Sequence, residues 1–499
     1  MNWSELASKV KGNMKLGQLL EGLKKLNFSG DETLNITDLA YHTGQVKPGC
    51  CFAAIRGLQT DGHHYIDEAV RKGAKAVLIE RDISVPRGVS KIIVEDTRDC
   101  LGRLSALLFG EPTKSLRLVG ITGTNGKTTI AYLIDSIWQA ASYKSGLIST
   151  VAYRYGDQLK PAERTTPESY DLQQMFRQMV SKGVTDCVME VTSHALDLKR
   201  VIGCHFDGAV FTNLSQDHLD YHKDMESYFA AKAKLFRERL VVSEKKSLWA
   251  VLNWDDPYGR TLAGGLPAKI WRYGVREKAD VWASNPKASW DGLRLNVVSP
   301  QGNFPLSSSL IGSFNASNIL AAVAASLAME IPIDQISLGV ASFKGVPGRL
   351  EKISNSKGIE IFVDYAHTPA ALENVLNTLR ALNPKKLITV FGCGGNRDKT
   401  KRPLMGAAAS CLSDVAIVTS DNPRDEGPQA IINDILPGLK KNRESLMIVD
   451  RKEAISKALE LAAPGDCVLI AGKGHETYQE ARGVKKHFDD REVAKECLI

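Results

Sequence analysis

The clearest candidate for chemistry is the run Gly123-Thr124-Asn125-Gly126-Lys127-Thr128-Thr129. An apolar, strand-like run precedes it, and a helical pattern from about Ile130 to Ala141 follows. A phosphate-binding loop needs this order, because backbone N–H groups at a helix N-terminus meet phosphate oxygens and glycines allow close approach. Lys127 can neutralise phosphate charge, and the Thr128 hydroxyl can ligate magnesium. Ile121 stands where the usual pattern has its first glycine, so a chance glycine turn is the alternative to the nucleotide-binding loop that we predict.

Further candidates follow two strand-like runs. Glu190 comes after Cys187–Met189, and His218 comes after Ala209–Phe211. A carboxylate at a strand end is a natural anchor for magnesium, which prefers oxygen ligands. The residues alone leave structural roles open as alternatives. A lone histidine is more often a hydrogen-bonded structural residue, and a helix lysine such as Lys232 is usually solvated.

Two arginines in the last third of the chain suit anion binding. Arg397 follows FGCGGN, and Arg424 lies in SDNPRDE. Each guanidinium can bind a carboxylate in a bidentate manner, although surface salt bridging is the alternative for either arginine alone. With Glu476 at an adjoining strand end, the pair favours recognition of a zwitterionic amino acid.

The elements that must position these residues alternate strands with helices. Four apolar strands are expected in the last third, at Ile359–Val363, Leu387–Phe391, Val415–Thr419 and Val468–Ala471. Each runs into a polar residue or glycine, and open parallel sheets bind ligands at the carboxyl ends of their strands. These four ends therefore predict one shared crevice. Upstream, Leu293–Ser299 and Phe304–Leu310 alternate around a turn and predict a hairpin added to the central sheet.

The chain is longer than one hydrophobic core usually supports, because 499 residues correspond to about three domains at the usual 100 to 200 residues each. We expect an α/β protein with an N-terminal α/β domain at residues 1–112. A central domain with a phosphate-loop parallel sheet and the added hairpin is expected at 113–345. A C-terminal, doubly wound Rossmann-like domain is expected at 346–499.

Composition excludes several classes. Hydrophobic residues make up 43% and charged residues 24%, so neither disorder nor a fibrous class is indicated. The net charge of +7 is spread along the chain, which fits a polyanionic small substrate rather than nucleic acid, whose binding usually needs a dense basic stripe.

The cysteines and the apolar runs of the sequence both bear on the compartment of the protein. Nine cysteines without a CxxC pair indicate neither a disulfide framework nor a zinc ribbon, and they favour a reducing compartment. The first residues have no signal-peptide core, and no run approaches about 18 apolar residues. We expect a cytoplasmic protein without a membrane span.

Ten motifs occur in order between about residues 15 and 495: GITGTNGKTT, TTPE, EVTSHAL, TNLSQDHLDYH, AKAKLF, GRLE, DYAHTP, GNRDKTKRP, DNPR and GKGHE. In order and spacing they resemble the Mur ligases, and such a string is far more specific than any single motif. The resemblance implies an N-terminal domain for the UDP end of the substrate, a central ATPase domain and a C-terminal domain for the incoming amino acid.

The resemblance also implies ATP and Mg²⁺. Residues Gly123, Thr124, Asn125, Gly126, Lys127, Thr128 and Thr129 would hold the ATP phosphates, and Asn315, Arg349, Asp364 and His367 would line the nucleotide. Metal ligands would be Thr128, Glu190, His218 and Lys232, whose amine the family carbamylates with CO₂ to give a carboxylate. The catalytic set would be Lys127, Glu190, His218 and Lys232.

The implied substrates are UDP-N-acetylmuramoyl-L-alanyl-D-glutamate and meso-2,6-diaminopimelate. The first would meet Thr43, Leu58, Gln59, Thr60, Thr165, Thr166, Thr192 and Arg200. The second would meet Arg397, Asp421, Asn422, Pro423, Arg424, Gly472 and Glu476, since lysine-adding relatives usually lack the arginine of DNPR. The chain departs from the family at His42-Thr43-Gly44, where Asp-Ser-Arg is common, and at Arg164 and Leu198.

The implied reaction forms an acyl phosphate from the D-glutamate side-chain carboxylate and ATP, which the diaminopimelate amine then attacks while the domains close. The alternatives are an L-lysine-adding Mur ligase and a folylpolyglutamate synthase, although the UDP-side domain and DNPR oppose the latter. A phosphate-loop switch or motor lacks support because no NKxD motif occurs, and intact Lys127, Glu190, His218 and Lys232 oppose a non-catalytic scaffold. We expect a monomer.

Overall fold

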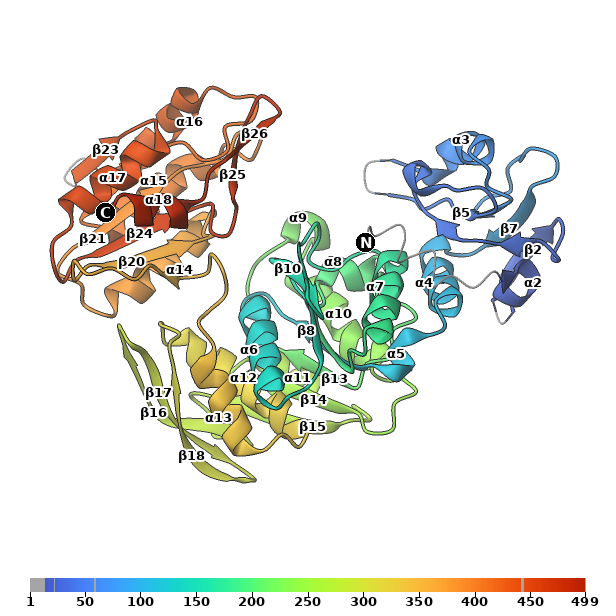
Figure 1. The fold of residues 1–499 in the computed structure, drawn as a ribbon, viewed down its shortest axis with the longest axis horizontal. Helices are drawn as coiled ribbons and strands as arrows, with labels where there is room; N and C mark the ends of the chain where they lie inside the picture. Colours follow the sequence, from blue (N-terminus) through green and yellow to red (C-terminus); the bar gives the residue numbers. More distant parts are fainter. Residues whose placement is uncertain (1–13, 22, 58–59, 441–443, 499) are drawn as a thin grey trace. The chain divides into compact units, whose positions relative to one another are not determined.

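The computed structural model describes residues 14–21, 23–57, 60–440 and 444–498. Leu58 and Gln59, expected at the UDP end of the substrate, lie outside the described residues. The chain divides into two compact units, whose helices and strands are labelled in Figure 1. Unit 1 comprises Met1–Ala283, Val297–Phe304 and Ser317–Val340, and unit 2 comprises Ser284–Asn296, Pro305–Ala316 and Ala341–Ile499. Residues 1–112 and most of residues 113–345 thus fall in unit 1, whereas residues 284–296, 305–316 and 341–345 of the predicted central domain fall in unit 2. The division into three domains stays a prediction.

Unit 1 begins with a five-stranded sheet in the order β2-β7-β6-β5-β4. Its strands are β2 Lys25–Ser29, β4 Leu39–Ala40, β5 Cys51–Ala53, β6 Ala76–Ile79 and β7 Ser90–Val94. All neighbours are parallel except β2 and β7. Leu101, Leu104 and Leu108 of helix α4 (Thr97–Leu108) join Leu78 in one buried core.

An eleven-stranded sheet follows in the order β11-β10-β9-β12-β8-β13-β14-β15-β16-β17-β18. Its strands are β8 Arg117–Thr122, β9 Ser145–Ile148, β10 Ala152–Tyr155, β11 Gln158–Pro161, β12 Asp186–Glu190, β13 Gly208–Phe211, β14 Trp249–Asn253, β15 Lys269–Gly274, β16 Val281–Ser289, β17 Gly292–Ser299 and β18 Gly302–Ser308. Strands β9, β12, β8, β13, β14 and β15 run parallel, so their carboxyl ends share one edge. The predicted hairpin corresponds to β17 and β18.

Helices connect these strands. Their bounds are α2 Leu16–Leu19, α3 Ile66–Arg71, α5 Pro112–Ser115, α6 Lys127–Ala140, α7 Ser169–Ser181, α8 Ser193–Asp197, α9 Leu219–His222, α10 Met225–Lys234, α11 Pro257–Leu262, α12 Phe314–Ala328 and α13 Ile333–Ser342. Helix α6 begins earlier than expected, directly at Lys127. No helix in the described parts of the chain is both long and apolar enough to span a membrane.

Unit 2 contains a six-stranded sheet in the order β19-β20-β24-β21-β22-β23. Its strands are β19 Glu351–Lys352, β20 Glu360–Asp364, β21 Leu387–Phe391, β22 Val415–Val418, β23 Glu444–Met447 and β24 Cys467–Ala471. All are parallel except β19. The four strands expected here are confirmed, whereas β23 and the antiparallel hairpin of β25 (Tyr478–Ala481) and β26 (Val484–His487) were not predicted.

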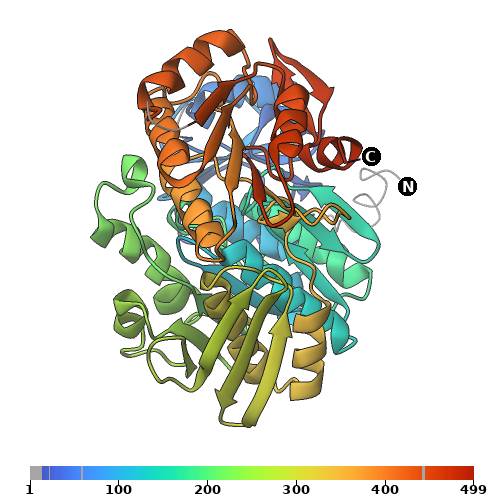
Figure 2. The same cartoon turned by 90° about the vertical axis from the view of Figure 1, so that its left-hand side faces the viewer.

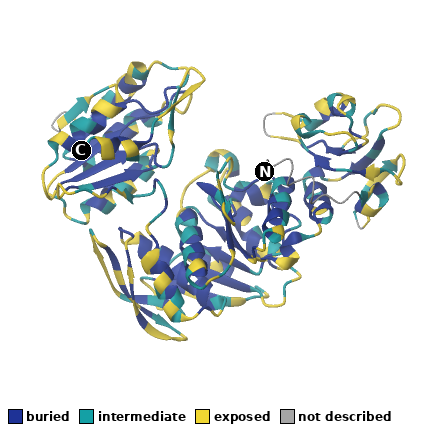
Figure 3. Ribbon diagram, in the orientation of Figure 1, coloured by how far each residue is buried: buried dark blue, intermediate teal, exposed yellow. Residues whose placement is uncertain are grey.

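Alternation within these strands builds a core on each face of the sheet. Phe362 lies in the core with helices α14 (Pro369–Arg380), α15 (Lys401–Leu412) and α16 (Pro428–Ile435), while Ile361 lies in the core with α17 (Arg451–Leu461) and α18 (Asp490–Glu496). Figure 2 shows these helices, in orange and red, on either side of the sheet, and Figure 3 shows the strands buried between them. The predicted doubly wound architecture is confirmed.

Candidate active site

The glycine-rich run forms a loop between β8 and α6. Gly126 is the N-cap of α6 with φ 88°, and Gly123 has φ 149°. A Cβ on Gly123 would lie 1.8 Å from Thr212 Oγ1, and one on Gly126 would lie 2.3 Å from Asn318 Oδ1. Both positions therefore require glycine. Ile121, at the position where the usual pattern has glycine, is a fully buried residue of β8, so this part of the loop needs no glycine.

The loop is held by the segment after β13. Thr124 N donates to Asn213 O at 2.8 Å, and Asn125 N donates to Asn213 Oδ1 at 3.0 Å. The Thr212 hydroxyl donates to Asn125 O at 2.7 Å. These bonds fix the backbone of the loop in the manner that a preformed anion site requires.

Two lysines converge on this loop. Lys127 Nζ donates to Gly123 O at 3.0 Å and Thr124 O at 2.8 Å, and Lys232 Nζ donates to Gly123 O at 2.9 Å. The Lys232 side chain, on α10, is 1% exposed and its Nζ lies 4.3 Å from the Tyr228 ring centroid. Burial, and then the neighbouring charge of Lys127, lower the pKa of Lys232 well below its usual value. The solvated-lysine alternative is therefore wrong.

Glu190, the last residue of β12, is fully buried. Its carboxylate accepts hydrogen bonds from Thr150 N at 2.8 Å and from the Thr150 hydroxyl at 3.2 Å. That hydroxyl is 3.1 Å from Thr165 Oγ1, and the Thr166 hydroxyl donates to Glu190 O at 2.9 Å. The structure thus joins a predicted metal ligand to two residues predicted to bind the nucleotide sugar.

His218 is the N-cap of α9, with φ 53° and a half-exposed side chain. Its Nε2 lies 3.6 Å from Asp217 Oδ2, and its ring lies 4.9 Å from that of His194. Within the described residues, no group of three His, Cys, Asp or Glu side chains could hold a metal ion. Mg²⁺ commonly takes nucleotide oxygens as well as protein ligands into its coordination shell.

A cleft of about 590 Å³ lies in unit 1. It is lined by Tyr41, His42, Thr43, Phe52, Ile55, Gly57, Thr60, Gly62, Tyr65, Arg98, Arg164, Glu168, Leu198 and Arg200. Thr43, Thr60 and Arg200 of the predicted nucleotide-sugar set thus share one cleft. Arg200 Nη1 donates to Thr166 O at 3.1 Å, and Thr192 N donates to the Thr166 hydroxyl at 3.2 Å. The cleft is therefore connected to the remaining predicted threonines.

Three arginines of this cleft surround one glutamate. Glu168 Oε1 lies 2.9 Å from Arg164 Nη1 and 3.0 Å from Arg200 Nε, and Glu168 Oε2 lies 3.3 Å from Arg98 Nη1. Burial, together with the charges of Arg164 and Arg98, lowers the pKa of Arg200. One carboxylate leaves two positive charges unbalanced in the cleft, which suits an anionic ligand. Arg98 and Glu168 were not predicted as site residues, although the i, i+4 spacing of Arg164 and Glu168 indicates that the two side chains can pair.

The residues predicted to bind the amino acid lie in unit 2. Asn422 Nδ2 donates to Glu476 Oε2 at 2.8 Å, and the fully buried Lys473 Nζ donates to Glu476 Oε2 at 3.1 Å and to Asn422 Oδ1 at 3.2 Å. Lys473 was not predicted, because the sequence does not reveal the burial of a lysine inside GKGHE.

Arg424 and its neighbours complete this group. Arg424 has φ 51°, its N–H donates to Glu480 O at 3.0 Å, and its Nη1 donates to Gly395 O at 2.8 Å. A Cβ on Gly394 would lie 2.9 Å from Arg424 Nη1 and 3.8 Å from Arg397 Cγ, so both arginines flank Gly394. A Cβ on Gly472 would lie 2.7 Å from Asp421 Oδ2. The structure therefore brings the predicted strand ends together.

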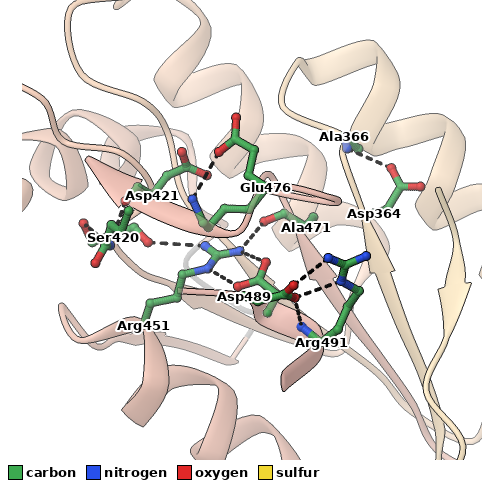
Figure 4. A network of polar contacts seen from close by, with 12 residues as sticks. Asp364, Ala366, Ser420, Asp421, Arg451, Ala471, Glu476, Asp489 and Arg491 are labelled. Carbon is green, nitrogen blue, oxygen red and sulfur yellow. Dashed lines mark hydrogen bonds and ion pairs between the residues drawn. The ribbon is translucent and has the colours of Figure 1, made fainter. Parts of the chain in front are cut away.

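The other residues predicted to line the nucleotide also lie in unit 2. Asp364 is buried, which raises its pKa, and it accepts a hydrogen bond from Leu350 N at 2.7 Å. It also accepts one from Ala366 N at 2.8 Å (Figure 4). The Arg349 guanidinium lies 5.0 Å from the Tyr365 ring centroid. His367 Nδ1 lies 2.8 Å from Tyr365 O, and Asn315 Nδ2 donates to Ile311 O at 2.8 Å.

Comparison with known families covers most of the chain. Residues 35–107 match "Mur ligase family, catalytic domain", residues 121–326 match "Mur ligase middle domain" and residues 348–474 match "Mur ligase, glutamate ligase domain".

Curated relatives extend over the whole length. The UDP-N-acetylmuramoyl-L-alanyl-D-glutamate--2,6-diaminopimelate ligase of Geobacter metallireducens is 46% identical, with 96% of this chain and 97% of the relative covered. The ligase of the same name from Bacillus licheniformis is 45% identical, with 97% and 99% covered. A solved structure of a ligase with this name is 33% identical, with a TM-score of 0.72 over 98% of this chain and 99% of that one.

Proposed function

Because this chain belongs to the Mur ligase family, we propose that it joins meso-2,6-diaminopimelate to the D-glutamate side-chain carboxylate of UDP-N-acetylmuramoyl-L-alanyl-D-glutamate. The reaction consumes ATP, forms ADP and phosphate, and serves peptidoglycan synthesis. The names of relatives at 45% and 46% identity support this substrate pair. We also propose three domains, at residues 1–112, 113–345 and 346–499, a proposal supported by the presence of one large sheet within each range.

The observation that carries the choice of amino acid is the polar group in unit 2. Diaminopimelate has a second amino acid head, so its pocket must satisfy both a carboxylate and an ammonium. Arg424 supplies a guanidinium, and Glu476 supplies a carboxylate that Asn422 already orients at 2.8 Å. Lysine lacks the distal carboxylate, and a site built for a charged group rejects ligands that leave it unpaired. An L-lysine-adding ligase is therefore the less suitable alternative.

The loop between β8 and α6 is the proposed site of the ATP phosphates. In the structure, Lys127 Nζ donates to carbonyl oxygens of its own loop, at Gly123 and Thr124. We propose that it turns to the transferring γ-phosphoryl group, where it stabilises the negative charge while the D-glutamate carboxylate attacks phosphorus. The phosphorus–oxygen bond to ADP breaks, and an acyl phosphate forms. The diaminopimelate amine then attacks the acyl carbon and expels phosphate.

The donor set fits Mg²⁺ held jointly by protein and nucleotide. The Thr128 hydroxyl, Glu190, His218 and a carbamate on Lys232 are the proposed protein ligands, and all are oxygen donors except His218. Bound Mg²⁺ would neutralise phosphate charge. Glu190 is buried and already oriented by Thr150, which favours a fixed ligand.

Carbamylation of Lys232 is supported by the state of its amine. Carbon dioxide reacts with a neutral amine: the C–N bond forms, a proton leaves, and the product is a carbamate with one negative charge. Burial and Lys127 lower the pKa of Lys232 well below its usual value, which favours the neutral amine. The negative carbamate would also relieve the repulsion between the two lysines.

The cleft with Arg98, Arg164 and Arg200 is the proposed site of the nucleotide-sugar dipeptide. Thr43 and Thr60 line it and are proposed to meet the UDP end. Leu58 and Gln59, which lie outside the described residues, are proposed to contribute to the same function. Thr165, Thr166 and Thr192 are proposed to meet the dipeptide, because they lie between the cleft and Glu190. Since ATP is a substrate, we propose action in the cytoplasm, and we propose a monomer that size-exclusion chromatography with light scattering would test.

The deciding experiment measures phosphate release from ATP in the presence of UDP-N-acetylmuramoyl-L-alanyl-D-glutamate. Separate reactions contain meso-diaminopimelate, L-lysine or no amino acid, and the product mass is determined. We expect turnover only with diaminopimelate and a product heavier by that residue. Preference for lysine would overturn the amino acid assignment, and absence of turnover with either would favour a folylpolyglutamate synthase-like ligase, tested next with a folate substrate.

A further inference from the structure

A buried ion pair in unit 2 joins the first residues of two helices. Arg451 begins α17 and Asp490 begins α18, and both side chains are fully buried. Arg451 Nε donates to Asp490 Oδ1 and Nη2 donates to Asp490 Oδ2, each at 2.7 Å. Such a bidentate pair fixes the guanidinium in one orientation.

The guanidinium has further donors that point to the sheet. Arg451 Nη1 donates to Ser420 O at 3.3 Å, and Nη2 donates to Ala471 O at 3.0 Å (Figure 4). Ser420 lies just beyond β22, and Ala471 is the last residue of β24. These two strands do not hydrogen-bond to each other, because β21 lies between them in the sheet. Arg451 therefore bridges the carboxyl ends of two strands that the sheet itself does not pair.

The two bridged carbonyl groups directly precede the proposed amino-acid pocket. Asp421-Asn422-Pro423-Arg424 follows Ser420, and Gly472 follows Ala471 in the segment that leads to Glu476. The distance between Asn422 Nδ2 and Glu476 Oε2, 2.8 Å, depends on the relative position of these strand ends. A shift of either end would separate groups that must bind one amino acid together.

We propose that Arg451 and Asp490 are positioning residues for the amino-acid pocket: Asp490 orients the guanidinium, and the guanidinium holds the two strand ends at the spacing that diaminopimelate requires. This inference rests on the proposed function of Asn422, Arg424 and Glu476. Burying an ion pair costs desolvation energy, so an apolar pair of similar volume could stabilise the fold as well. An apolar pair has no donors for the two carbonyl groups, whereas a guanidinium has five.

The test separates positioning from stability. In Arg451→Met/Asp490→Leu the whole pair is replaced by apolar side chains, and in Arg451→Lys the charge is kept but the planar fork is lost. The matched control is Arg380→Met/Asp414→Leu, a pair with 2.7 Å between Arg380 Nη2 and Asp414 Oδ2. This pair lies at the amino-terminal ends of β21 and β22, whereas Arg451 lies at the carboxyl ends of β22 and β24. KM and kcat are measured for each of the three substrates in the full chain, with thermal unfolding alongside.

We expect both Arg451 variants to raise the KM for diaminopimelate by about tenfold or more, while the KM values for ATP and the nucleotide sugar stay unchanged. The control pair should leave all three KM values unchanged. Unchanged diaminopimelate KM in Arg451→Lys and the double variant, or an equal rise for all three substrates, would overturn the proposal. If the double variant does not fold, Arg451→Lys alone decides between these outcomes.

Failure of the proposed function is recognised separately. It would appear in the unmodified protein as absent turnover with diaminopimelate, or as an unchanged diaminopimelate KM in Glu476→Gln. A normal effect of Glu476→Gln combined with no effect of the Arg451 variants would overturn the positioning role alone.

Discussion

Lys127 and Lys232 donate hydrogen bonds to the same acceptor, the carbonyl oxygen of Gly123, at 3.0 and 2.9 Å. Two ammonium groups so close repel each other, and Lys232 is the buried member. The proton is therefore lost more easily from Lys232, as the lowered pKa indicates. The lowered pKa of Lys232 favours its neutral amine, the form that the proposed reaction with CO₂ requires.

Replacement of Lys232 by methionine should abolish activity without weakening the fold. The folded pKa of Lys232 is depressed, so at pH values between the folded and the unfolded pKa the unfolded chain binds a proton that the folded chain lacks. Folding therefore loses stability as pH falls below the usual lysine pKa, and methionine removes this loss. We expect phosphate release to fall by about 100-fold or more and the melting temperature to stay equal or rise.

Lys234→Met on the same helix is the control, because Lys234 pairs with Asp197 at the surface. Retained activity in Lys232→Met would contradict the carbamate role. Incubation of the unmodified protein with ¹³CO₂ should give a carbamate carbon signal by NMR that the Lys232→Met protein lacks.

Gly123→Ala should impair ATP binding. The new Cβ would meet Thr212 Oγ1 at 1.8 Å, and the φ of 149° disfavours any side chain. We expect a rise of about tenfold or more in the KM for ATP, with a loss of about 1 to 3 kcal/mol in the free energy of unfolding. Gly264→Ala, whose Cβ would approach no atom closer than 4.0 Å, should behave like the unmodified protein. An unaltered KM for ATP in Gly123→Ala would remove the loop from the nucleotide site.

Arg200→Ala should weaken binding of the nucleotide sugar specifically. The Arg200 side chain is 14% exposed and lies against Glu168, so its loss leaves a buried carboxylate with less positive charge around it. We expect the KM for the nucleotide sugar to rise by about tenfold to 100-fold, with a smaller rise for the half-exposed Arg164→Ala. The KM for ATP should stay constant in both. Steady-state kinetics with one substrate varied at a time would check this, and equal effects on all substrates would contradict it.

Arg424→Asn should reduce the preference for diaminopimelate over L-lysine. Asparagine tolerates the left-handed backbone, so the change removes the guanidinium without forcing the φ of 51° on a less tolerant residue. We expect the ratio of kcat/KM values for the two amino acids to fall by about tenfold or more. Arg482→Asn is the matched control, since Arg482 is exposed and has a similar φ of 50°. An unchanged ratio would dismiss Arg424 as the selectivity residue.

Acid should destabilise unit 2 through His475. Burial, and then the charges of Arg349 and Arg491, lower the pKa of His475 from its usual 6.5 to about 4. Between these values the unfolded chain binds a proton that the folded chain does not, so stability is lost as pH falls from about 6.5 to about 4. We expect His475→Phe to lose less stability over this window in urea unfolding at pH 7.0, 5.5 and 4.5. Parallel pH profiles for the two proteins would contradict this assignment.

The sequence predicts those parts of the site that depend on local pattern. A glycine-rich loop between strand and helix, and apolar strands that end in polar residues, are short-range features, and the structure contains them at β8, β20, β21, β22 and β24. Exact ends were less predictable, since α6 begins at Lys127 rather than at Ile130. The β25–β26 hairpin was not predicted, because its second strand is exposed throughout and shows no apolar alternation.

The missed residues act through contacts between distant segments. Arg98 meets Glu168 across 70 positions in the sequence, and Arg451 meets Asp490 across 39. Burial of Lys232 and Lys473 likewise results from tertiary packing, while their neighbours in the sequence look like those of ordinary surface lysines. Family resemblance supplied the proposed role of Lys232, which its residue type alone did not.

The position of β24 in its sheet has a consequence for how the protein folds. This strand comes last of the six in the chain, yet it lies between β20 and β21, and Cys467 pairs with Glu360 more than a hundred residues earlier. The centre of the sheet therefore depends on contacts of high sequence separation, whose loop-closure entropy slows folding. Unit 2 should fold late and as a whole, because β20 and β21 have no common partner strand until β24 pairs with both.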